Sequence, residues 1–339
     1  MIQIAVLGAG HWGPNLIRNF DNRQRSAVRW IVDRDPARLA AAEARFPGAK
    51  LTTQPAEAIA DPAVDAVVIA TPTITHYELA KAALERGKHV LVEKPLADSA
   101  AACRELIELA ERTERVLLVG HVFLFNPAVR WVKEYLDSGQ LGAIYYVSSQ
   151  RTNLGPIRTD VNAAWDLASQ DLSIFNYWLG TTPRSACAVA GTWLNPGIAD
   201  AVFATLRYPG DVLAHLHVSW LNPRKNRDIT VVAQRRMLTY DDMSLSEPIR
   251  VYDKRVAEQR TESNFVDTFA SFRSSVREGD ITIPRVAMGE PLAAECEHFL
   301  DCLESKARPQ CGGAEALDVV RVLEAISRSI AGGGREEQV

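Results

Sequence analysis

Residues 2–13 read IQIAVLGAGHWG, an apolar run that leads directly into a glycine-rich loop. The run predicts a buried strand, and the residues after the loop continue as a helix. Between a strand and a helix, the spacing of Gly8, Gly10 and Gly13 is typical of dinucleotide-binding loops. The first glycine allows a tight turn, the second lets a pyrophosphate approach the backbone, and the third lets helix and strand pack closely. His11 and Trp12 complete this predicted cofactor loop.

An acidic residue follows at the expected distance. Asp33 closes the predicted strand Val28–Val32 and lies 20 residues after Gly13. A carboxylate there accepts hydrogen bonds from the ribose hydroxyls of NAD and repels the 2′-phosphate of NADP. Arg34 comes next and weakens that repulsion, so the sequence favours NAD and leaves NADP as the second choice.

The first 121 residues alternate apolar strands with helical patterns. Further strands are expected at Val64–Ala70, His89–Val92 and Val116–Val119, and helices at Pro36–Phe46, His76–Arg86 and Ala97–Arg112. Unbroken apolar strands separated by helices are typical of a parallel sheet covered on both faces. We therefore expect residues 1–121 to form an NAD-binding Rossmann domain.

The pattern changes after Gly120. Longer, alternating strands are expected at Ile144–Arg151, Ala186–Trp193, Ala201–Tyr208, Val212–Trp220 and Asp228–Tyr240, and helices at Pro127–Ser138, Asp166–Leu179, Pro291–Ser305 and Ala314–Ile330. Such strands suit an open, mostly antiparallel sheet. The predicted fold class is α/β, with an α+β second domain over residues 122–339 and a disordered tail at 332–339. The exposed face of such a sheet needs to be covered. Large side chains such as Phe203 would be covered either by packing within one chain or by pairing with another subunit.

Composition narrows the possible functions. The chain has 339 residues, an apolar share of 47% and a formal net charge of −4. No basic stripe and no apolar run of membrane-spanning length occurs, so we expect neither a nucleic-acid nor a membrane partner. The first residues predict a core strand rather than a signal peptide, and five scattered cysteines favour a cytoplasmic protein. His215 and His217 share a face of a predicted strand, where we expect ordinary sheet histidines and no metal site.

Polar residues follow two strands of the predicted parallel sheet, where open α/β sheets bind ligands. Thr71, Pro72 and Thr73 would form a ledge beside the dinucleotide, and His76 either joins them or begins the next helix. Glu93-Lys94-Pro95 ends the following strand. A charged pair at that place is costly to bury unless it has a function, and a lysine there can transfer a substrate proton.

These motifs, with Gly120-His121 through Asn126-Pro127, resemble the glucose-fructose oxidoreductase / inositol dehydrogenase / MocA (Gfo/Idh/MocA) family over nearly the whole chain. The resemblance implies a dinucleotide-binding oxidoreductase with Lys94 as its acid/base. It also implies a second domain whose sheet forms homodimers or homotetramers. The substrate would lie between Lys94, the nicotinamide and the start of the helix at Asp166–Asp171, with Glu93 and Trp165 near the cofactor.

Two segments, residues 151–158 and 162–167, resemble the branch that oxidises the 3-hydroxyl of UDP-N-acetylglucosamine derivatives. The candidate substrate-binding residues on these segments are Arg151, Asn153, Arg158, Asn162 and Asp166. Arginine forks suit a phosphate-bearing substrate, although each of these residues taken alone also fits a solvated loop.

One position departs from the family pattern, which places a histidine four residues after the aspartate. Here that position is Gln170. An amide can orient a hydroxyl, but it cannot accept a proton at neutral pH as histidine does. Three outcomes stay open: Lys94 acts alone while Gln170 orients the substrate, Asp171 or His76 supplies a proton route, or the redox chemistry is weakened.

The leading hypothesis is an NAD-dependent oxidoreductase that transfers a hydride between a sugar ring hydroxyl and the nicotinamide, most readily C3 of a nucleotide-linked sugar. Its catalytic residues would be Lys94, Asp166 and Gln170. A free sugar, polyol or glycoside is the alternative substrate. A dinucleotide-binding sensor without turnover, and a redox-neutral enzyme that re-reduces its product with a trapped cofactor, are the competing functions.

Overall fold

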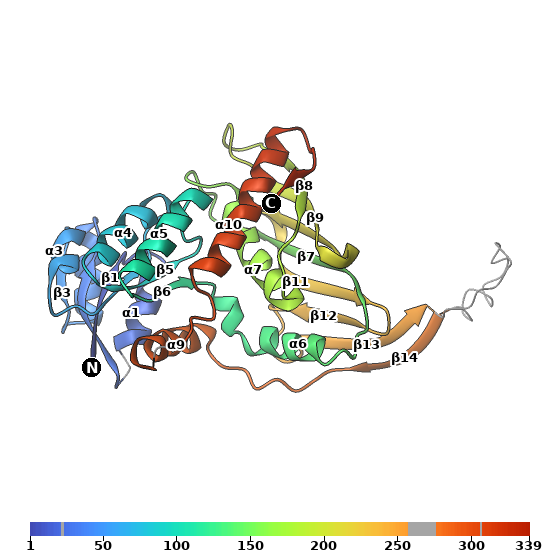
Figure 1. Cartoon of the computed structure of the whole chain (residues 1–339), viewed down its shortest axis with the longest axis horizontal. Coiled ribbons are helices and arrows are strands. Elements are labelled where there is room, and N and C mark those ends of the chain that lie inside the picture. Colours follow the sequence, from blue (N-terminus) through green and yellow to red (C-terminus); the bar gives the residue numbers. More distant parts are fainter. Residues whose placement is uncertain (22–23, 257–275, 306) are drawn as a thin grey trace. The chain divides into compact units, whose positions relative to one another are not determined.

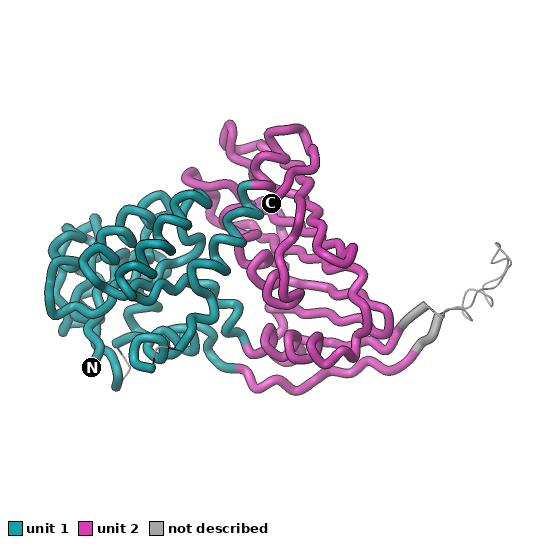
Figure 2. The backbone as a smooth tube through the Cα atoms, in the orientation of Figure 1, with its two compact units in different colours: residues 1–126, 289–324 teal, residues 127–288, 325–339 magenta. Residues whose placement is uncertain are grey.

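The computed structural model describes residues 1–21, 24–256, 276–305 and 307–339. Its contacts divide the chain into two compact units, shown in Figure 2. The first unit contains residues 1–126 and 289–324, and the second contains residues 127–288 and 325–339. The chain therefore leaves the first unit after Asn126, returns to it at Gly289 and leaves it again after Glu324.

A parallel sheet of six strands forms the centre of the first unit. Its strands are β1 (Ile2–Leu7), β2 (Ser26–Val32), β3 (Lys50–Thr52), β4 (Ala66–Ile69), β5 (His89–Glu93) and β6 (Leu117–Gly120). The spatial order is β3-β2-β1-β4-β5-β6, so the direction of strand addition reverses between β1 and β4. Ligands of such sheets bind beyond the carboxyl ends of the strands at this reversal.

Helices cover both faces of this sheet, and Figure 1 shows α4 and α5 on one side with α1 and α9 on the other. The helices are α1 (Gly13–Asp21), α2 (Pro36–Arg45), α3 (Pro55–Ala60), α4 (His76–Glu85), α5 (Ala100–Arg112), α9 (Pro291–Ser305) and the first part of α10 (Gly313–Ala331). Short 3-10 turns, η1 (Thr73–Thr75) and η2 (Val122–Phe125), follow β4 and β6. Residues 4–7 of β1 and 66–69 of β4 are wholly buried, as strands covered on both faces require.

The second unit contains a sheet of nine strands in the order β14-β13-β12-β11-β7-β10-β9-β8-β15. The strands are β7 (Ile144–Leu154), β8 (Ser185–Gly191), β9 (Ala201–Arg207), β10 (Leu213–Ser219), β11 (Leu221–Ala233), β12 (Met237–Asp241), β13 (Ile249–Val256), β14 (Val276–Thr282) and β15 (Glu337–Gln338). Among the described residues β7 and β10 pair in parallel, and the other neighbouring strands pair antiparallel. The predicted fold class is therefore confirmed.

One face of this second sheet is covered and the other is open. The helices α6 (Pro127–Asp137) and α7 (Ser169–Leu179) contact each other, and α7 packs on β7 (Figure 1). Side chains alternate along β9, where Val202 and Ala204 are buried while Phe203 is exposed. This period of two is expected when only one face of a sheet contributes to the core.

The structure differs from the sequence-based expectations in three local features. The strand expected over Asp228–Tyr240 is two strands, β11 and β12, joined by a polar turn at residues 234–236. The tail expected to be disordered turns back at Gly333 and Gly334, which have positive φ angles, and β15 pairs with β8. The helix expected from Asp166 begins with a π-helical turn, η3 (Ala164–Ala168).

The division into units also differs from the expected boundary at residue 121, because residues 289–324 belong to the first unit. Long-range packing is the reason: Phe299 of α9 meets Phe20 of α1 edge to face, with ring centroids 6.1 Å apart. Arg18 of α1 also forms an ion pair with Glu290, the residue before α9. No helix in the described part of the chain is both long and apolar enough to span a bilayer.

Candidate functional site

The glycine loop after β1 is shaped by close backbone contacts. Gly8 has a φ angle of +100°, and a Cβ atom there would lie 2.6 Å from the carbonyl oxygen of Ala70 at the end of β4. A Cβ atom on Gly13 would lie 1.9 Å from the carbonyl oxygen of Gly8. Both positions therefore require glycine, one for the turn and one for the packing of α1 on the loop. This loop and the N-terminus of α1 fit the pyrophosphate of a dinucleotide.

Asp33 lies beside the glycine loop at the end of β2. Its Oδ2 accepts a hydrogen bond from the Ala9 amide over 2.8 Å, and its Oδ1 accepts one from the Asp35 amide over 2.9 Å. These two bonds hold the carboxylate at the edge of the loop. Arg38 Nη1 lies 3.6 Å from Asp33 Oδ2, while Arg34 and His11 are exposed to solvent. The residues present therefore fit the ribose of a dinucleotide.

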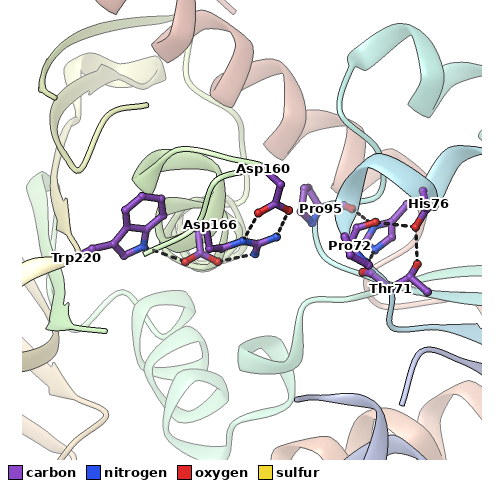
Figure 3. A network of polar contacts seen from close by, with 9 residues as sticks. Thr71, Pro72, His76, Pro95, Asp160, Asp166 and Trp220 are labelled. Atoms are coloured by element: carbon purple, nitrogen blue, oxygen red, sulfur yellow. Dashed lines mark hydrogen bonds and ion pairs between the residues drawn. The ribbon is translucent and has the colours of Figure 1, made fainter. Parts of the chain in front are cut away.

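His76 connects two of the predicted ledge segments. Its Nδ1 lies 2.8 Å from the carbonyl oxygen of Pro95, and its Nε2 lies 2.8 Å from that of Thr71 (Figure 3). Whichever ring nitrogen carries the hydrogen donates to one of these carbonyls. Thr75 donates from its hydroxyl to the Pro72 carbonyl over 2.8 Å. His76 is 1% exposed, so its position favours fastening the turn after β5 to the end of β4 over carrying a substrate proton.

The ends of β5 and β6 bring Glu93, Lys94 and His121 together. Glu93 pairs in register with Gly120, where a Cβ atom would lie 3.0 Å from Glu93 Oε2. Burial raises the pKa of the Glu93 carboxyl to about 7, against the opposing effect of the Lys94 charge. Burial, together with the Lys94 charge, lowers the pKa of His121 to about 3. Strand ends thus place a lysine next to a carboxyl of unusual proton affinity and a neutral imidazole.

In the second unit, Asp166 lies in the π-helical turn before α7. Its Oδ1 lies 3.0 Å from Arg158 Nη1, and its Oδ2 accepts a hydrogen bond from Trp220 Nε1 over 3.1 Å (Figure 3). Arg158 also forms an ion pair with Asp160. Single π-helical turns are frequent at functional sites. The two donors hold Asp166 as an oriented carboxylate.

Gln170 occupies the first turn of α7 and is 8% exposed. Within the described residues, its Oε1 is buried and has no hydrogen-bond partner. An unpartnered amide oxygen of this kind can accept a hydrogen bond from a ligand hydroxyl.

Several residues expected to bind substrate have partners within the second unit. The guanidinium of Arg151 donates from Nε and Nη2 to Asp171 Oδ1 over 2.9 and 2.7 Å, and both side chains are buried. The Asn162 side chain accepts a hydrogen bond from the Trp165 amide over 3.1 Å. The Trp165 indole donates to Ser327 Oγ over 3.0 Å. These contacts stabilise the loop and α7, and they occupy Arg151 and Asp171.

The remaining candidate, Asn153, is half-buried near the end of β7. The Asn153 amide folds over the backbone of Gly155, where a Cβ atom would meet it at 1.9 Å. Two buried residues of the candidate site, His121 and Trp220, were not assigned a role from sequence. Trp220 lies 54 residues from Asp166 along the chain, and no sequence pattern connects the two.

Two protein-family models match the chain. One, described as an oxidoreductase family with an NAD-binding Rossmann fold, matches residues 2–121, and the other, the GFO/IDH/MocA C-terminal domain, matches residues 129–239. The fold and the glycine loop thus place the chain in the class of proteins with an NAD-binding Rossmann domain. The chain belongs to the Gfo/Idh/MocA family, which confirms the resemblance found in its sequence.

Curated relatives include inositol 2-dehydrogenase 2 of Saccharopolyspora erythraea, 34% identical over 211 residues, which are 61% of this chain and 62% of that protein. The 4-carboxy-2-hydroxymuconate-6-semialdehyde dehydrogenase of Sphingobium sp. is 31% identical over 232 residues, covering 65% of this chain and 73% of the relative. The chain thus aligns with less than two thirds of the first relative's length.

Solved structures match over nearly the full length. GenD2 from gentamicin A biosynthesis, in complex with NAD, is 25% identical with a TM-score of 0.83, covering 100% of this chain and 96% of its own. The UDP-N-acetylglucosamine 3-dehydrogenase GnnA from Acidithiobacillus ferrooxidans is 24% identical with a TM-score of 0.81, covering 98% of each chain. The second of these likenesses concerns the fold alone.

Proposed function

We propose that the protein is an NAD-dependent sugar oxidoreductase that transfers a hydride between a hydroxyl-bearing carbon and the nicotinamide. The observation that carries this proposal is the placement of Lys94 at the end of β5, in the same parallel sheet whose β1 and β2 ends hold Gly8 and Asp33. Cofactor-binding groups and a proton-accepting lysine thus share one edge of one sheet.

When bound, NAD supplies the hydride acceptor. The glycine loop and the N-terminus of α1 would hold its pyrophosphate, and Asp33 would accept hydrogen bonds from its ribose hydroxyls. Lys94 takes the proton from the substrate hydroxyl during oxidation and returns it during reduction. Asp166, oriented by Trp220 and Arg158, binds a neighbouring hydroxyl.

Gln170 stands where the family pattern has a histidine, so Lys94 has the whole proton-transfer role. The buried, unpartnered Oε1 of Gln170 supports a role in accepting a hydrogen bond from a sugar hydroxyl. Asp171 is an unsuitable alternative base because Arg151 neutralises it inside the protein.

The partners of the two candidate arginines indicate which class of sugar the site would bind. Oxidation at C3 of a nucleotide-linked sugar was the first expectation, and it drew on Arg151 and Arg158 as phosphate ligands. Arg151 is paired with Asp171, and Arg158 is shared between Asp160 and Asp166. Both cations are thus engaged by carboxylates, which favours an uncharged sugar, aminosugar or cyclic polyol and makes the nucleotide-linked sugar the second candidate.

The test is to add NAD and a panel of substrates and to follow the absorbance of the reduced nicotinamide. The panel contains inositols, free sugars, aminosugars and UDP-N-acetylglucosamine, and Gln170→His is assayed beside the native protein. Turnover of an uncharged compound supports the proposal, whereas turnover of UDP-N-acetylglucosamine alone favours the nucleotide-sugar alternative. Turnover by the variant alone would contradict the assignment of proton transfer to Lys94 without a second base.

The missing histidine favours one second function, a dinucleotide-binding sensor. A sensor would bind NAD and a sugar, measured by calorimetry, without producing reduced nicotinamide or a changed sugar. A redox-neutral enzyme with a trapped cofactor is distinguished by product analysis, because the sugar changes while no reduced nicotinamide accumulates.

The open face of the second sheet supports a homodimer or homotetramer. Phe203, Val189 and Leu213 are exposed on it, and His217 stacks on Phe203 with ring centroids 4.3 Å apart. Light scattering of the native protein and of Phe203→Asp tests this, with dissociation expected for the variant.

A further inference from the structure

Arg38 brings a positive charge to the carboxylate that fits the cofactor ribose, and it has no role in the proposed reaction. It lies in the first turn of α2, which Asp35 caps by accepting a hydrogen bond from the Ala37 amide over 2.9 Å. Long side chains on a helix lean toward its N-terminus. The Arg38 side chain accordingly reaches back to the end of β2, where its Nη1 lies 3.6 Å from Asp33 Oδ2.

The same guanidinium also lies over the glycine loop. A Cβ atom on Gly10 would lie 3.2 Å from Arg38 Nη1. Arg38 Nε lies 3.5 Å from Asp35 Oδ2. All of these residues belong to the first unit. Arg38 is therefore placed between the loop that fits the pyrophosphate and the carboxylate that fits the ribose.

Asp33 and Arg38 differ in how firmly they are held. The Asp33 side chain is 5% exposed and accepts hydrogen bonds from the Ala9 and Asp35 amides, so its carboxylate has a fixed position. The Arg38 side chain is 53% exposed, and its two contacts of 3.5–3.6 Å are longer than the about 2.7–2.9 Å of a charge-assisted hydrogen bond. A guanidinium has more N–H donors than these two contacts engage. Arg38 can therefore turn toward an arriving anion while Asp33 stays in place.

The nearby cation changes what the end of β2 can accept. A carboxylate at this position repels the 2′-phosphate of NADP. The charge of Arg38 offsets that repulsion, and the planar guanidinium matches the oxygens of a phosphate as a two-pronged donor. The same residue thus weakens the rejection of the 2′-phosphate and offers it a ligand.

We propose that Arg38 is a specificity-determining residue that lets the protein bind NADP as well as NAD. The inference rests on the proposed function only in taking the end of β2 as the ribose site. With NAD, Asp33 accepts hydrogen bonds from the ribose hydroxyls, and Arg38 keeps its contacts with the two acids. With NADP, the guanidinium turns from Asp33 to the 2′-phosphate.

The first test is calorimetry of the complete protein with each dinucleotide, without substrate. We expect the Kd values of NAD and NADP to differ by less than about tenfold in the native protein. Arg38→Met should raise the Kd of NADP by about tenfold or more, because charge-assisted hydrogen bonds to the phosphate are lost, and should change that of NAD by less than about threefold. Arg38→Lys keeps the charge without the fork, so its Kd for NADP should lie between those of the native protein and Arg38→Met.

The second test isolates the 2′-phosphate from the rest of the cofactor. Adenosine 2′,5′-bisphosphate and adenosine 5′-monophosphate are compared as ligands of the native protein and of Arg38→Met. We expect the variant to lose affinity for the bisphosphate alone. In the native protein the affinity for NADP should fall more steeply with salt than the affinity for NAD, and Arg38→Met should remove this difference.

Two other arginines serve as controls. Arg45→Met removes a positive charge from the last turn of the same helix and should leave the ratio of the two Kd values unchanged. Arg34→Met removes the exposed arginine next to Asp33 and should change the ratio less than Arg38→Met does.

Three results would overturn the inference and leave the proposed function intact. They are a native protein that binds NAD and rejects NADP, an equal loss of both dinucleotides in Arg38→Met, and a loss of NADP affinity in Arg34→Met as large as that in Arg38→Met. Binding of neither dinucleotide by the native protein would overturn the proposed function together with this inference.

Discussion

Arg151 and Asp171 form an ion pair inside the second unit, with Arg151 Nη2 2.7 Å from Asp171 Oδ1 and at most 6% of either side chain exposed. Ser149 donates a further hydrogen bond to Asp171 Oδ2 over 3.3 Å. The pair joins β7 to α7, the helix whose first turn contains Gln170.

Removing one member of this pair is expected to destabilise the protein strongly. Arg151→Met leaves the Asp171 carboxylate buried and unpaired, which lowers the free energy of unfolding by about 3–5 kcal/mol. The double variant Arg151→Met/Asp171→Leu restores much of this loss. Denaturant unfolding measures both, with Arg207→Met as a control that breaks an exposed ion pair worth less than about 1 kcal/mol. A small effect of Arg151→Met on stability with a large rise in KM would instead assign Arg151 to the substrate.

Lys94→Met is expected to abolish most of the turnover while keeping the cofactor. Because the lysine transfers the substrate proton, kcat should fall by about 10²–10⁴-fold, and the Kd of NAD should change little. Stopped-assay rates and calorimetry measure the two quantities. Lys133→Met, at a half-buried residue on α6, should change neither. Full activity of Lys94→Met would remove the lysine from the mechanism.

Two buried tryptophans allow a matched comparison in the second unit. Trp220→Phe removes the hydrogen bond to Asp166, whereas Trp178→Phe removes one to the Val129 carbonyl. Each should lower the free energy of unfolding by about 1–3 kcal/mol. Trp220→Phe alone should lower kcat/KM, by about tenfold, because it releases the Asp166 carboxylate from its orientation. Equal kcat/KM values for the two variants would show that the Trp220 bond serves stability only.

Asp33→Ser is expected to change the preferred dinucleotide. The serine hydroxyl does not repel a 2′-phosphate, and Arg34 and Arg38 lie nearby to attract it. The ratio of the NAD and NADP Kd values should shift toward NADP by about tenfold or more, ~1.4 kcal/mol. Asp35→Ser is the control because serine also caps α2. An equal loss of affinity for both dinucleotides would mean that Asp33 only shapes the loop.

His121 makes the protein sensitive to acid. Its pKa is lowered from 6.5 to about 3, so the unfolded chain takes up a proton well before the folded chain does. Stability from this residue is therefore complete above about pH 6.5 and is lost as the pH falls toward 3. Between about pH 6.5 and about pH 4.5 the native protein should lose roughly 2 kcal/mol more than His121→Asn.

Thermal unfolding across this pH range measures the effect, with His215→Asn on the exposed sheet face as the control. Parallel pH dependences for the native protein and His121→Asn would show that the imidazole is protonated in the folded state.

Patterns within short segments predicted most of the fold. The parallel sheet follows from apolar runs such as Ile2–Leu7, and the second sheet follows from alternation of the kind seen along β9. The turn between β11 and β12 was not predicted because polar residues 234–236 also fit the solvent face of one long strand. The tail at 332–339 was expected to be disordered because its composition does not show that β8 offers it an unpaired edge.

The candidate site was predictable only where its chemistry is local. Gly8, Gly13 and Asp33 follow one another at a characteristic spacing, and Glu93-Lys94 ends a strand. The partners of Arg151 and the neighbours of Glu93 depend on which residues meet after folding. A sequence shows that Arg151 lies on a strand, but not that its side chain turns toward Asp171.

The chain crosses between the two units three times, after residues 126, 288 and 324. A chimera with another family member that exchanges the cofactor-binding unit therefore needs three junctions, since a single crossover near residue 121 would separate α1 from α9. Genetic recombination at one point would combine residues 1–121 of one protein with the segment 289–324 of another, and these two parts have not evolved to pack together. The first unit is therefore encoded by two separate stretches of the gene, and the second stretch, for residues 289–324, lies beyond most of the coding sequence of the second unit. Both stretches must be inherited together for the first unit to stay intact.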